Sequence, residues 1–598
     1  MVESAIIDWD EHGAPRSRKF DDIYYSRDGG LAESDAVFLK GCDLPAAWAG
    51  RDRFVVGELG FGTGLNILAL LDLWRRTRPP AGRLHIFSLE AYPPTRDAAR
   101  RALAAFPEVA DLAERLLRAW PGARGVHRLD FPDLGAVLDL AVMEAAEALR
   151  GWDGLADAWF LDGFSPAKNP QMWRAEVLEL VAERSAPDAR LATFTVAGAV
   201  RRTLQAQGFA IAKRPGFGAK GERLEGRLDR PATGARARRD PGRICIIGAG
   251  VAGAALTRAF RSIGQDPLLI DAEGVGAGAS GNPAALVTPR LDAGGGAGAQ
   301  LHAQAFRRAQ DVYGRDAPHC VIARGAVQLE ATDRDASRFD RVARSDLFEV
   351  DAFTRLTPVD AGSRLGEATC VGGLWLKDAL VIEPAAALAA LIGDCPVRIA
   401  QVGRLEAAAS GWRILAPDGA VICEADTVCI AAGFDSGSLA ADLALQAIRG
   451  QATTARADSA PTAASWGGYL IPTREGLLFG ATHDRDDSVQ GVRAEDDARN
   501  LEMLGRARPA LAAALSGGTL GARAGVRAAA QDHHSIAGAL AGGEGLYGLT
   551  GLGGRGFVLA PLLAEHIAAL ATGAPSPLPL ALSRIVRPER FSLGSGSR

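Results

Sequence analysis

Residues 244–253 read ICIIGAGVAG, an apolar run that leads into a glycine-rich turn. The turn has the spacing GxGxxG, with glycines at Gly248, Gly250 and Gly253, and an Ala-rich helical pattern follows it. Asp271 ends the next apolar run, PLLID, at the spacing of about 20 residues at which an acid accepts a ribose hydroxyl. Glycines let the backbone approach a pyrophosphate, and a helix N-terminus favours its negative charge. The stretch therefore predicts a βαβ unit that binds an adenine dinucleotide.

Two further glycine-rich stretches favour FAD over NAD. Residues 274–289 read GVGAGASGNPAALVTP, a stretch of the sort that runs beneath an isoalloxazine ring. Residues 546–570 form a strand, a glycine turn and a helix whose N-terminus can stabilise negative charge on a reduced flavin. The segments VQLEAT, GGYLIPT and GLLFGATHD between them are typical of antiparallel strands of a substrate domain. The predicted flavin contacts from the two stretches are Ser280, Gly281, Asn282, Gly553, Gly554, Arg555 and Gly556.

A different glycine loop, GELGFGTGLNIL, lies at residues 57–68. It has an acid before GxGxG and lacks the third glycine of the dinucleotide fingerprint. S-adenosylmethionine has no phosphate; its amino acid part can lie along the loop, and its ribose needs carboxylate acceptors. Glu90 ends the next strand and suits the ribose, and Asp130, after VHRL, suits the adenine amino group. The loop thus indicates a methyl-donor site rather than a structural turn, with predicted contacts Glu58, Gly60, Gly62, Gly64, Asn66, Glu90 and Asp130.

A candidate methyl-acceptor site follows in DAWFLDGFSPAKNPQMW, residues 157–173. Asp162 ends the apolar run, where a carboxylate can hold an amine and take its proton, although an Asp that caps a turn is the plainer interpretation. We expect the SPAKNP loop to close on the substrate, with Lys168 and Asn169 in contact with it. Phe164 and Trp173 can stack a nucleobase or pack in the core.

Bulk composition is that of an ordinary globular protein, with 48% hydrophobic and 23% charged residues. The seven cysteines form no CxxC pair, so we expect no metal, no disulfide framework and a reducing cytoplasm. The N-terminus has no secretory pattern, and no apolar run approaches the ~18 residues of a membrane helix. A monomer without membrane contact is the expectation.

The domain organisation follows from alternating strands and helices on both sides of a basic segment. Residues 213–243 carry ten Lys or Arg against four acids, although the whole chain has a formal charge of −4. We interpret this segment as a solvated linker and keep a nucleic-acid contact as the alternative. The predicted domains are 1–225 and 243–598, with a linker at 226–242. In the second domain, a cofactor part is predicted at 243–300 and 520–580, and a substrate part at 310–515.

The motifs together resemble the family of bifunctional tRNA 5-methylaminomethyl-2-thiouridine biosynthesis proteins. The resemblance rests on the two glycine loops, on DAWFLDGFSPAKNPQMW, and on GASGNPAALVTP, RGQATT and TGLGGRGFVLAPLLAE, and it covers nearly the whole chain. It implies an α/β fold: a Rossmann-like methyltransferase domain, then a FAD-binding Rossmann-type domain with an inserted α+β antiparallel-sheet substrate domain. It also implies that the flavin domain removes the carboxymethyl group from a wobble uridine of tRNA, and that the first domain methylates the resulting amine.

The same resemblance implies roles for residues of the flavin domain, which is similar to glycine and D-amino-acid oxidases. In GARAGVRAAAQDHHSIAG, Arg527 aligns with their carboxylate-binding arginine, and a bidentate guanidinium suits that task. Arg523 is the alternative. Tyr469 matches a substrate-side tyrosine or packs in the core, Arg555 is expected near the flavin edge, and His533 and His534 are left as surface residues.

Two other functions remain open from the residues. One is a glycine- or sarcosine-type amine oxidase fused to a methyltransferase of small amines. The other is a tRNA-binding protein that keeps its cofactor folds without catalysis.

Overall fold

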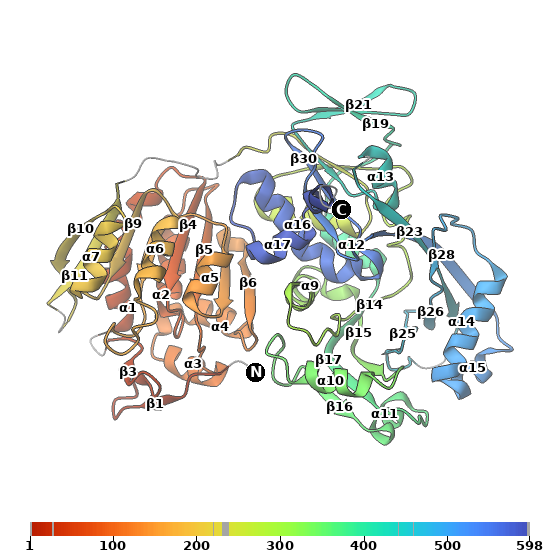
Figure 1. The fold of residues 1–598 in the computed structure, drawn as a ribbon, viewed down its shortest axis with the longest axis horizontal. Coiled ribbons are helices and arrows are strands. Elements are labelled where there is room, and N and C mark those ends of the chain that lie inside the picture. Colours follow the sequence, from red (N-terminus) through yellow and green to blue (C-terminus); the bar gives the residue numbers. More distant parts are fainter. Residues whose placement is uncertain are drawn as a thin grey trace. The chain divides into compact units, whose positions relative to one another are not determined.

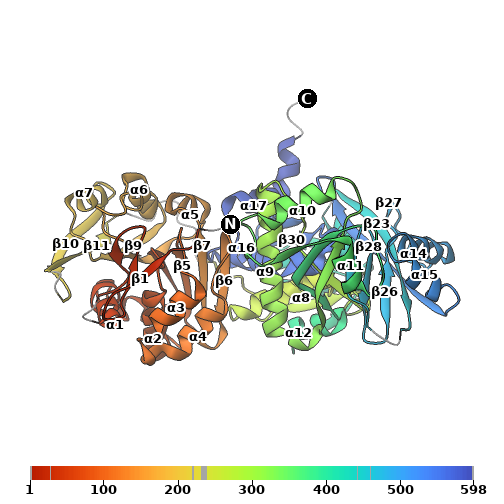
Figure 2. The same ribbon diagram turned by 90° about the horizontal axis from the view of Figure 1, so that it is seen from below.

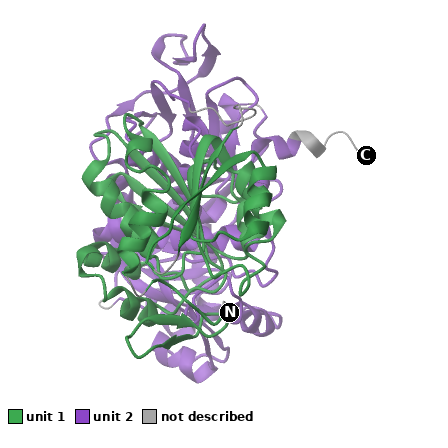
Figure 3. Cartoon of the chain, turned by 90° about the vertical axis from the view of Figure 1, so that its left-hand side faces the viewer, with its two compact units in different colours: residues 1–238, 575–580 green, residues 239–574, 581–598 purple. Residues whose placement is uncertain are grey.

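The computed structural model describes residues 3–26, 29–218, 221–229, 239–440, 442–457 and 460–594. The chain forms two compact units, coloured separately in Figure 3. The first comprises residues 1–238 together with 575–580, and the second comprises residues 239–574 and 581–598. The short segment Pro575–Leu580 thus belongs to the first unit although it lies near the end of the chain.

The first unit is built on one eight-stranded sheet, in the order β10-β11-β9-β8-β4-β5-β7-β6 (Figure 1). Strands β4, β5, β7, β8 and β9 are parallel to one another, and β6, β10 and β11 are antiparallel to their neighbours. The bounds are β4 (Arg53–Leu59), β5 (Arg83–Leu89), β6 (Gly125–Phe131), β7 (Ala136–Val142), β8 (Ala156–Leu161), β9 (Ser185–Thr193), β10 (Phe209–Pro215) and β11 (Glu222–Leu228).

Helices cover both faces of this sheet because successive residues of each strand point to opposite faces. Phe54 and Val56 of β4 pack with the helices that follow β4 and β5, whereas Val55 and Leu59 pack with those after β7, β8 and β9. The first group is α2 (Leu65–Thr77), α3 (Arg96–Leu103) and α4 (Ala110–Arg118), and the second is α5 (Ala145–Gly151), α6 (Ala175–Glu183) and α7 (Gly198–Ala206). A small sheet of β1 (Ile7–Trp9), β2 (Pro15–Ser17) and β3 (Asp22–Ile23), and α1 (Gly30–Glu33), precede them.

The basic segment is only partly a linker. Residues Phe209–Pro215 and Glu222–Leu228 form the antiparallel pair β10–β11 at the edge of the sheet, so the first unit extends beyond the predicted boundary at 225. Several of its cations are paired: Lys213 with Glu222, Arg223 with Glu225, and Arg227 with Asp188. Residues 230–238 of the predicted linker lie outside the described residues.

The second unit contains a six-stranded cofactor sheet in the order β18-β13-β12-β22-β30-β29. Its strands are parallel except β29, which is antiparallel to β30. The strands are β12 (Ile244–Ile247), β13 (Leu268–Asp271), β18 (Val397–Ile399), β22 (Thr427–Ile430), β29 (Ile536–Ala539) and β30 (Leu546–Thr550). Helices α8 (Val251–Ser262), α9 (Ala297–Asp316), α12 (Pro384–Ile392) and α16 (Gly556–Thr572) belong to this part.

A ten-stranded sheet forms the substrate part. Helices α14 (Ala494–Ala507) and α15 (Pro509–Leu515) lie beside its strands β23, β26 and β28 in Figures 1 and 2. The strands are β14 (Ala285–Val287), β15 (Val321–Leu329), β16 (Phe353–Leu356), β17 (Gly373–Ile382), β23 (Leu445–Ala455), β24 (Ala464–Ser465), β25 (Tyr469–Pro472), β26 (Leu477–Gly480), β27 (Asp484–Arg485) and β28 (Leu520–Ala530). The remaining helices are α10 (Asp335–Ala343), α11 (Pro358–Leu365), α13 (Ser436–Leu439) and α17 (Leu580–Val586).

The cofactor and substrate parts interleave more than the predicted ranges allow. Strand β18 pairs with β13 and strand β22 pairs with β12 in the cofactor sheet, although both fall within the predicted substrate part, 310–515. Strand β28 pairs with β23 in the substrate sheet although it falls within 520–580. Strands β18 and β22 have three and four residues and are too short to carry a periodic signal of their sheet. Strand β28 is longer, but its pairing with β23 is a tertiary contact that local pattern does not reveal. The strands β19 (Arg404–Ala407), β20 (Trp412–Leu415) and β21 (Val421–Ala425) form a separate small sheet at the upper end of Figure 1.

One helical segment, Gly553–Thr572, is long and apolar enough to cross a membrane by length and composition, and 72% of its apolar window is buried inside the protein. Such burial is typical of a core helix, and α16 packs against α8 and α9. Among the described residues, no group of three or more His, Cys, Asp or Glu is placed to hold a metal ion.

Candidate functional sites

The first site lies where the chain order of the parallel sheet reverses. Strand β4 pairs with β5 on one side and β8 on the other, so the loops after β4 and β8 meet at the carboxyl edge of the sheet. Gly60 has φ +76°, and a Cβ there would lie 2.9 Å from Cα of Gly163. Only glycine therefore permits this approach. The crevice is where an open α/β sheet binds its ligand.

Glu58 is the next-to-last residue of β4, and its side chain is fully buried. Its Oε2 accepts a hydrogen bond of 2.5 Å from the Ser88 hydroxyl, and its Oε1 has no hydrogen-bond partner among the described residues. Burial raises the pKa of this carboxyl to about 8, and the charge of Asp162 adds to the effect. An orphaned acceptor beside a glycine loop fits a ligand that brings a donor, as the ammonium of S-adenosylmethionine does.

Glu90 lies immediately after β5, within reach of the same loop. Its Oε2 accepts from the Gly62 amide at 3.0 Å, and its Oε1 accepts from the Tyr92 amide at 2.9 Å. Burial raises the pKa of the carboxyl, while these amide donors oppose the shift. Each oxygen keeps a lone pair for a ribose hydroxyl.

The structure places Asp130 elsewhere. Strand β6 runs antiparallel to β7, and Asp130 pairs with Val137, level with His85 of β5. The carboxyl edge lies at Leu89 and Ala141, several residues away along the strands. The prediction that Asp130 ends a strand beside the loop is corrected, because it assumed a parallel strand. Glu144, which follows β7, is the acid at that edge.

Asp162 follows β8 and contacts Asn66 of α2. The Asn66 amide nitrogen donates to Asp162 Oδ2 at 2.7 Å, and Asn66 Oδ1 accepts from the Ser34 hydroxyl at 2.6 Å. Ser34 and Asn66 are both buried. Asn66, predicted as a contact of the methyl donor, thus also orients the candidate acceptor carboxylate, and Ser34 is a residue that the sequence reasoning missed.

The predicted substrate contacts Lys168 and Asn169 hold the loop itself. The Lys168 ammonium contacts the Asp21 carbonyl oxygen and lies 3.6 Å from Asp21 Oδ2. Asp22 Oδ2 accepts from the Ser165 amide at 3.0 Å, and the side chain of Asn169 is buried. The loop after β8 is therefore tied to the N-terminal segment.

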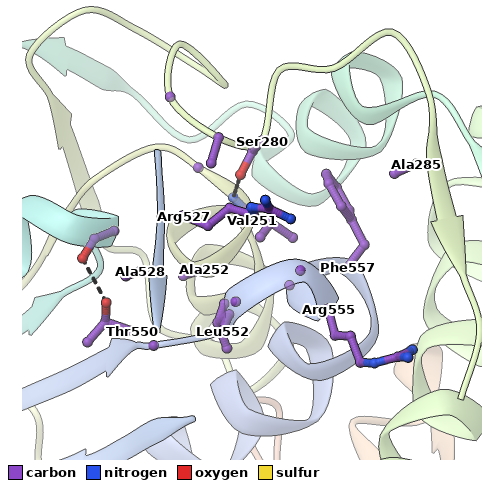
Figure 4. A pocket seen from close by; sticks show the side chains of 18 of the residues that line it. Val251, Ala252, Ser280, Ala285, Arg527, Ala528, Thr550, Leu552, Arg555 and Phe557 are labelled. Carbon is purple, nitrogen blue, oxygen red and sulfur yellow. Dashed lines mark hydrogen bonds between the residues drawn. The ribbon is translucent and has the colours of Figure 1, made fainter. Parts of the chain in front are cut away.

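The second site is a cavity of about 1610 Å³ in the second unit (Figure 4). A pocket of this size exceeds the ~300–1,000 Å³ of small-ligand sites and leaves room for a dinucleotide and a substrate group. Eleven of the predicted residues line it: Gly248, Gly250, Asp271, Ser280, Asn282, Tyr469, Arg527, Gly553, Gly554, Arg555 and Gly556. Val251 of the same turn lines it as well.

The dinucleotide turn is fixed by close contacts. A Cβ at Gly253 would lie 1.7 Å from the Gly248 carbonyl oxygen, so the helix can close on the strand only with glycine there. Asp271 Oδ2 accepts from the Ala249 amide at 2.7 Å. Ser280 Oγ accepts from the Val251 amide at 3.0 Å, as Figure 4 shows. The cradle fits a pyrophosphate and a ribose at the position predicted for FAD.

Arg523 and Arg527 lie on β28 but do different things. Arg523 Nη2 donates to the carbonyls of Ala277 and Gly278, at 2.8 and 2.6 Å, and so clamps the second glycine-rich stretch, where Gly281 also lies. Arg527 lines the cavity and donates to the Thr482 carbonyl at 3.3 Å. Burial lowers its pKa and raises the pKa of Tyr469 to about 12. A partly buried guanidinium whose hydrogen bond among the described residues is to a neutral carbonyl at 3.3 Å suits an anionic ligand.

Arg555 is the residue just before α16, and its side chain extends away from Arg527 in Figure 4. Its Nη1 donates to the carbonyls of Thr288 and Pro289, at 3.0 and 3.3 Å. Burial lowers its pKa to about 10, and the charge of Arg290 contributes. The residue joins the turn before α16 to the stretch that the flavin is expected to overlie.

Known relatives match along the whole chain. The chain is 55% identical over 593 residues to the tRNA 5-methylaminomethyl-2-thiouridine biosynthesis bifunctional protein MnmC of Caulobacter sp. (strain K31), covering 98% of this chain and 97% of that protein. The protein of the same name from Maricaulis maris (strain MCS10) is 40% identical over 598 residues, covering 99% and 96%.

The chain belongs to the family of tRNA 5-methylaminomethyl-2-thiouridine biosynthesis bifunctional proteins. A family model described as S-adenosyl-L-methionine-dependent methyltransferase matches residues 107–229, and one described as FAD dependent oxidoreductase matches residues 243–570. The predicted fold class, the two enzyme types and both cofactors are thereby confirmed. The loop at 57–68 precedes the residues that the first family model matches.

Solved structures resemble the FAD-dependent half of this family member. Glycine oxidase from Geobacillus kaustophilus superposes with a TM-score of 0.50 and 21% identity, covering 58% of this chain and 99% of that one. L-proline dehydrogenase from P. horikoshii gives a TM-score of 0.51 and 16% identity, covering 59% and 98%. At these identities the likeness shows the fold alone.

Proposed function

We propose that this protein carries out two consecutive steps on the wobble uridine of tRNA. The second unit would convert 5-carboxymethylaminomethyl-(2-thio)uridine to the 5-aminomethyl form, and the first unit would methylate the exposed amine. The observation that supports this best is the pair of chemically different cofactor cradles on one chain, together with 55% identity to a tRNA-modifying relative over 98% of the chain.

In the oxidative step, Arg527 would hold the carboxylate of the carboxymethylamino group, with Tyr469 beside it. This orientation presents the carbon between nitrogen and carboxylate to the flavin side of the cavity. That carbon loses a hydride and the nitrogen loses a proton, and water then hydrolyses the imine to the primary amine and glyoxylate. When bound, FAD would accept the hydride and would be held by the turn of Gly248, by Asp271 and by the turn before α16.

In the methylation step, Asp162 would accept a hydrogen bond from the primary amine and so aim its lone pair. The amine attacks in line, and the secondary ammonium that forms loses a proton near this carboxylate. Asn66 fixes the carboxylate through its 2.7 Å hydrogen bond. When bound, S-adenosylmethionine would supply the methyl group and would be held by Glu58, Glu90 and the backbone of the glycine loop.

We also propose the domain boundaries, the oligomeric state and the cellular location of the protein. We place the methyltransferase domain at 1–229 with the segment 575–580, and the oxidoreductase domain at 239–574 and 581–598. We also propose a monomer that acts on tRNA in the cytoplasm without membrane or metal. Lys168 and Asn169 are assigned to the closing loop.

The test is nucleoside mass spectrometry of tRNA from cells that lack the protein, complemented with variants. Without the protein, carboxymethylaminomethyl-uridines should accumulate. Asp162→Asn should leave the aminomethyl form, and Arg527→Ala should leave the carboxymethylaminomethyl form.

Unchanged wobble uridine in the deletion strain would refute the proposal. Rapid oxidation of free glycine or sarcosine by protein that has no affinity for tRNA would favour the small-molecule alternative. If Asp162→Asn and Arg527→Ala each stop both steps, the assignment of one step to each unit is wrong.

A further inference from the structure

Four aromatic rings form a continuous row in the first unit. The rings of Tyr92 and Phe20 have centroids 6.0 Å apart, and those of Phe20 and Phe164 are stacked at 4.8 Å. Tyr24 meets Phe164 edge to face at 5.1 Å. We call these four side chains the aromatic row.

The aromatic row spans the edge of the sheet between the two candidate carboxylates of the methyltransferase site. Tyr92 follows Glu90 after β5, and Phe164 follows Asp162 after β8. Phe20 and Tyr24 come from the N-terminal segment and bridge them. A Cβ on Gly62 would lie 3.2 Å from the Tyr24 ring, so one end of the row touches the glycine loop.

Hydrogen bonds to the backbone beside the aromatic row fix its position, yet none of its four side chains is buried. The Trp173 indole donates to the Phe164 carbonyl at 2.8 Å, and Asp22, between Phe20 and Tyr24, accepts from the Ser165 amide. All four rings remain partly exposed, whereas the neighbouring aromatics Trp159, Phe160 and Trp173 are buried. Rings fixed in position but open to solvent are costly unless they meet a ligand.

A cation already occupies part of the row. The Lys19 ammonium lies 3.4 Å from the centroid of the Tyr92 ring. Cations over aromatic faces gain from the ring quadrupole, and an aminomethyl group is cationic before it gives up its proton. Because Lys19 already covers the Tyr92 ring, a second cation is repelled there, and the open rings of the row are Phe20 and Phe164.

We propose that the aromatic row is the stacking platform for the uridine base whose aminomethyl group is methylated. Phe20 and Phe164 receive the base, and Tyr24 separates it from the methyl donor at the glycine loop. Stacking on a π-face requires no hydrogen-bond readout, so the platform accepts both the uridine and its 2-thio form. This inference rests on the proposed function, since it names the recognition element of the same site.

The test measures methylation kinetics with tRNA that carries the 5-aminomethyl group. Phe20→Ala and Phe164→Ala should each raise KM for this tRNA about tenfold or more, the loss expected for one base–aromatic stack. Affinity for S-adenosylhomocysteine should change by less than about twofold. Phe20→Trp should restore KM, because it replaces the stacking face.

Trp9→Ala is the matched control. Trp9 lies on β1 of the same N-terminal sheet, but its ring packs under Arg101 at 4.0 Å rather than in the row. Its removal should leave KM for tRNA unchanged, and far-ultraviolet circular dichroism should show that every variant is folded.

Three results would overturn the inference: an unchanged KM in both alanine variants, an equal loss of S-adenosylhomocysteine affinity, or no restoration by Phe20→Trp. The second result would make the row part of the methyl-donor site. If wild-type protein fails to methylate this tRNA at all, the proposed function itself fails, so the two failures are distinguishable.

Discussion

Glu58 links the chemistry of the first site to its stability. Its carboxyl has a pKa raised to about 8, well above the ordinary 4.5. As pH rises through 4.5 the unfolded chain ionises first, so stability is lost between pH 4.5 and about 8 and is level above that. Glu90, whose pKa is also raised, contributes in the same direction.

We expect the melting temperature of the first unit, measured without S-adenosylmethionine, to fall between pH 5 and 8. Glu58→Gln, which keeps an oxygen for the Ser88 hydroxyl, should make this fall smaller. Tryptophan fluorescence is a suitable probe because seven of the ten tryptophans lie before residue 238. An equal pH dependence in the variant would show that Glu58 is ionised in the folded protein.

Ser34 permits a sharper test of how Asp162 is oriented. Ser34→Ala removes the hydroxyl that fixes Asn66 Oδ1, so the amide that faces Asp162 is no longer held in one orientation. Loss of one partner in a buried network costs about 1–3 kcal/mol, and we expect kcat for methylation to fall by roughly tenfold. KM for S-adenosylmethionine and the oxidative step should be unchanged.

Ser34→Thr, which keeps the hydroxyl, should retain most of the activity. If Ser34→Ala lowers the melting temperature without changing kcat, the hydrogen bond is structural only.

At the scale of elements, the strand–turn–helix of the dinucleotide site depends on one glycine. Gly253→Ala places a methyl 1.7 Å from the Gly248 carbonyl oxygen, so α8 must move away from β12. We expect the variant to be purified with little or no flavin, at least tenfold below wild type by absorbance at about 450 nm per chain, while methylation persists.

Gly278→Ala serves as its control. It lies in the second glycine-rich stretch, and a Cβ there meets nothing within 4 Å. This variant should keep its flavin. If Gly253→Ala also binds flavin normally, the contact between the helix and the turn is not what shapes the cradle.

Elements with a strong local pattern could be predicted from the sequence. The apolar run that leads into the loop at 57–68 forms β4, and the apolar-periodic stretch after it forms α2, Leu65–Thr77. The long-range pairings could not be predicted. The antiparallel direction of β6, which puts Asp130 away from the carboxyl edge of the sheet, depends on tertiary pairing. Strands β18 and β22 are too short for their pattern to show which sheet they join.

The same limit applies to the site. Glycines and acids at strand ends can be recognised from their spacing in the sequence, as is the case for Gly248, Asp271 and Asp162. Ser34 and Phe20 carry no such signal because their partners, Asn66 and Phe164, are distant in sequence. The role of Arg523 as a clamp rather than a ligand became evident only from its two carbonyl contacts.

At the scale of the whole molecule, a net charge of −4 means that tRNA must be met by local basic surfaces. Raising monovalent salt from 50 to 200 mM should raise KM for tRNA by roughly tenfold or more in both steps, since released counterions drive such binding. The affinity for S-adenosylhomocysteine should be nearly constant. A KM for tRNA that is insensitive to salt would indicate that phosphate contacts contribute little.

The segment Pro575–Leu580 makes the first unit discontinuous in sequence. The Ser576 amide donates to Asp153 Oδ1 at 2.9 Å, and Ser576 and Leu578 are buried. A gene split between the two halves would therefore not yield two complete proteins, because the upstream product would lack six residues encoded nearly at the end of the downstream one. The two units are therefore interleaved in sequence rather than strictly consecutive, and a complete first unit requires a segment that is encoded within the second.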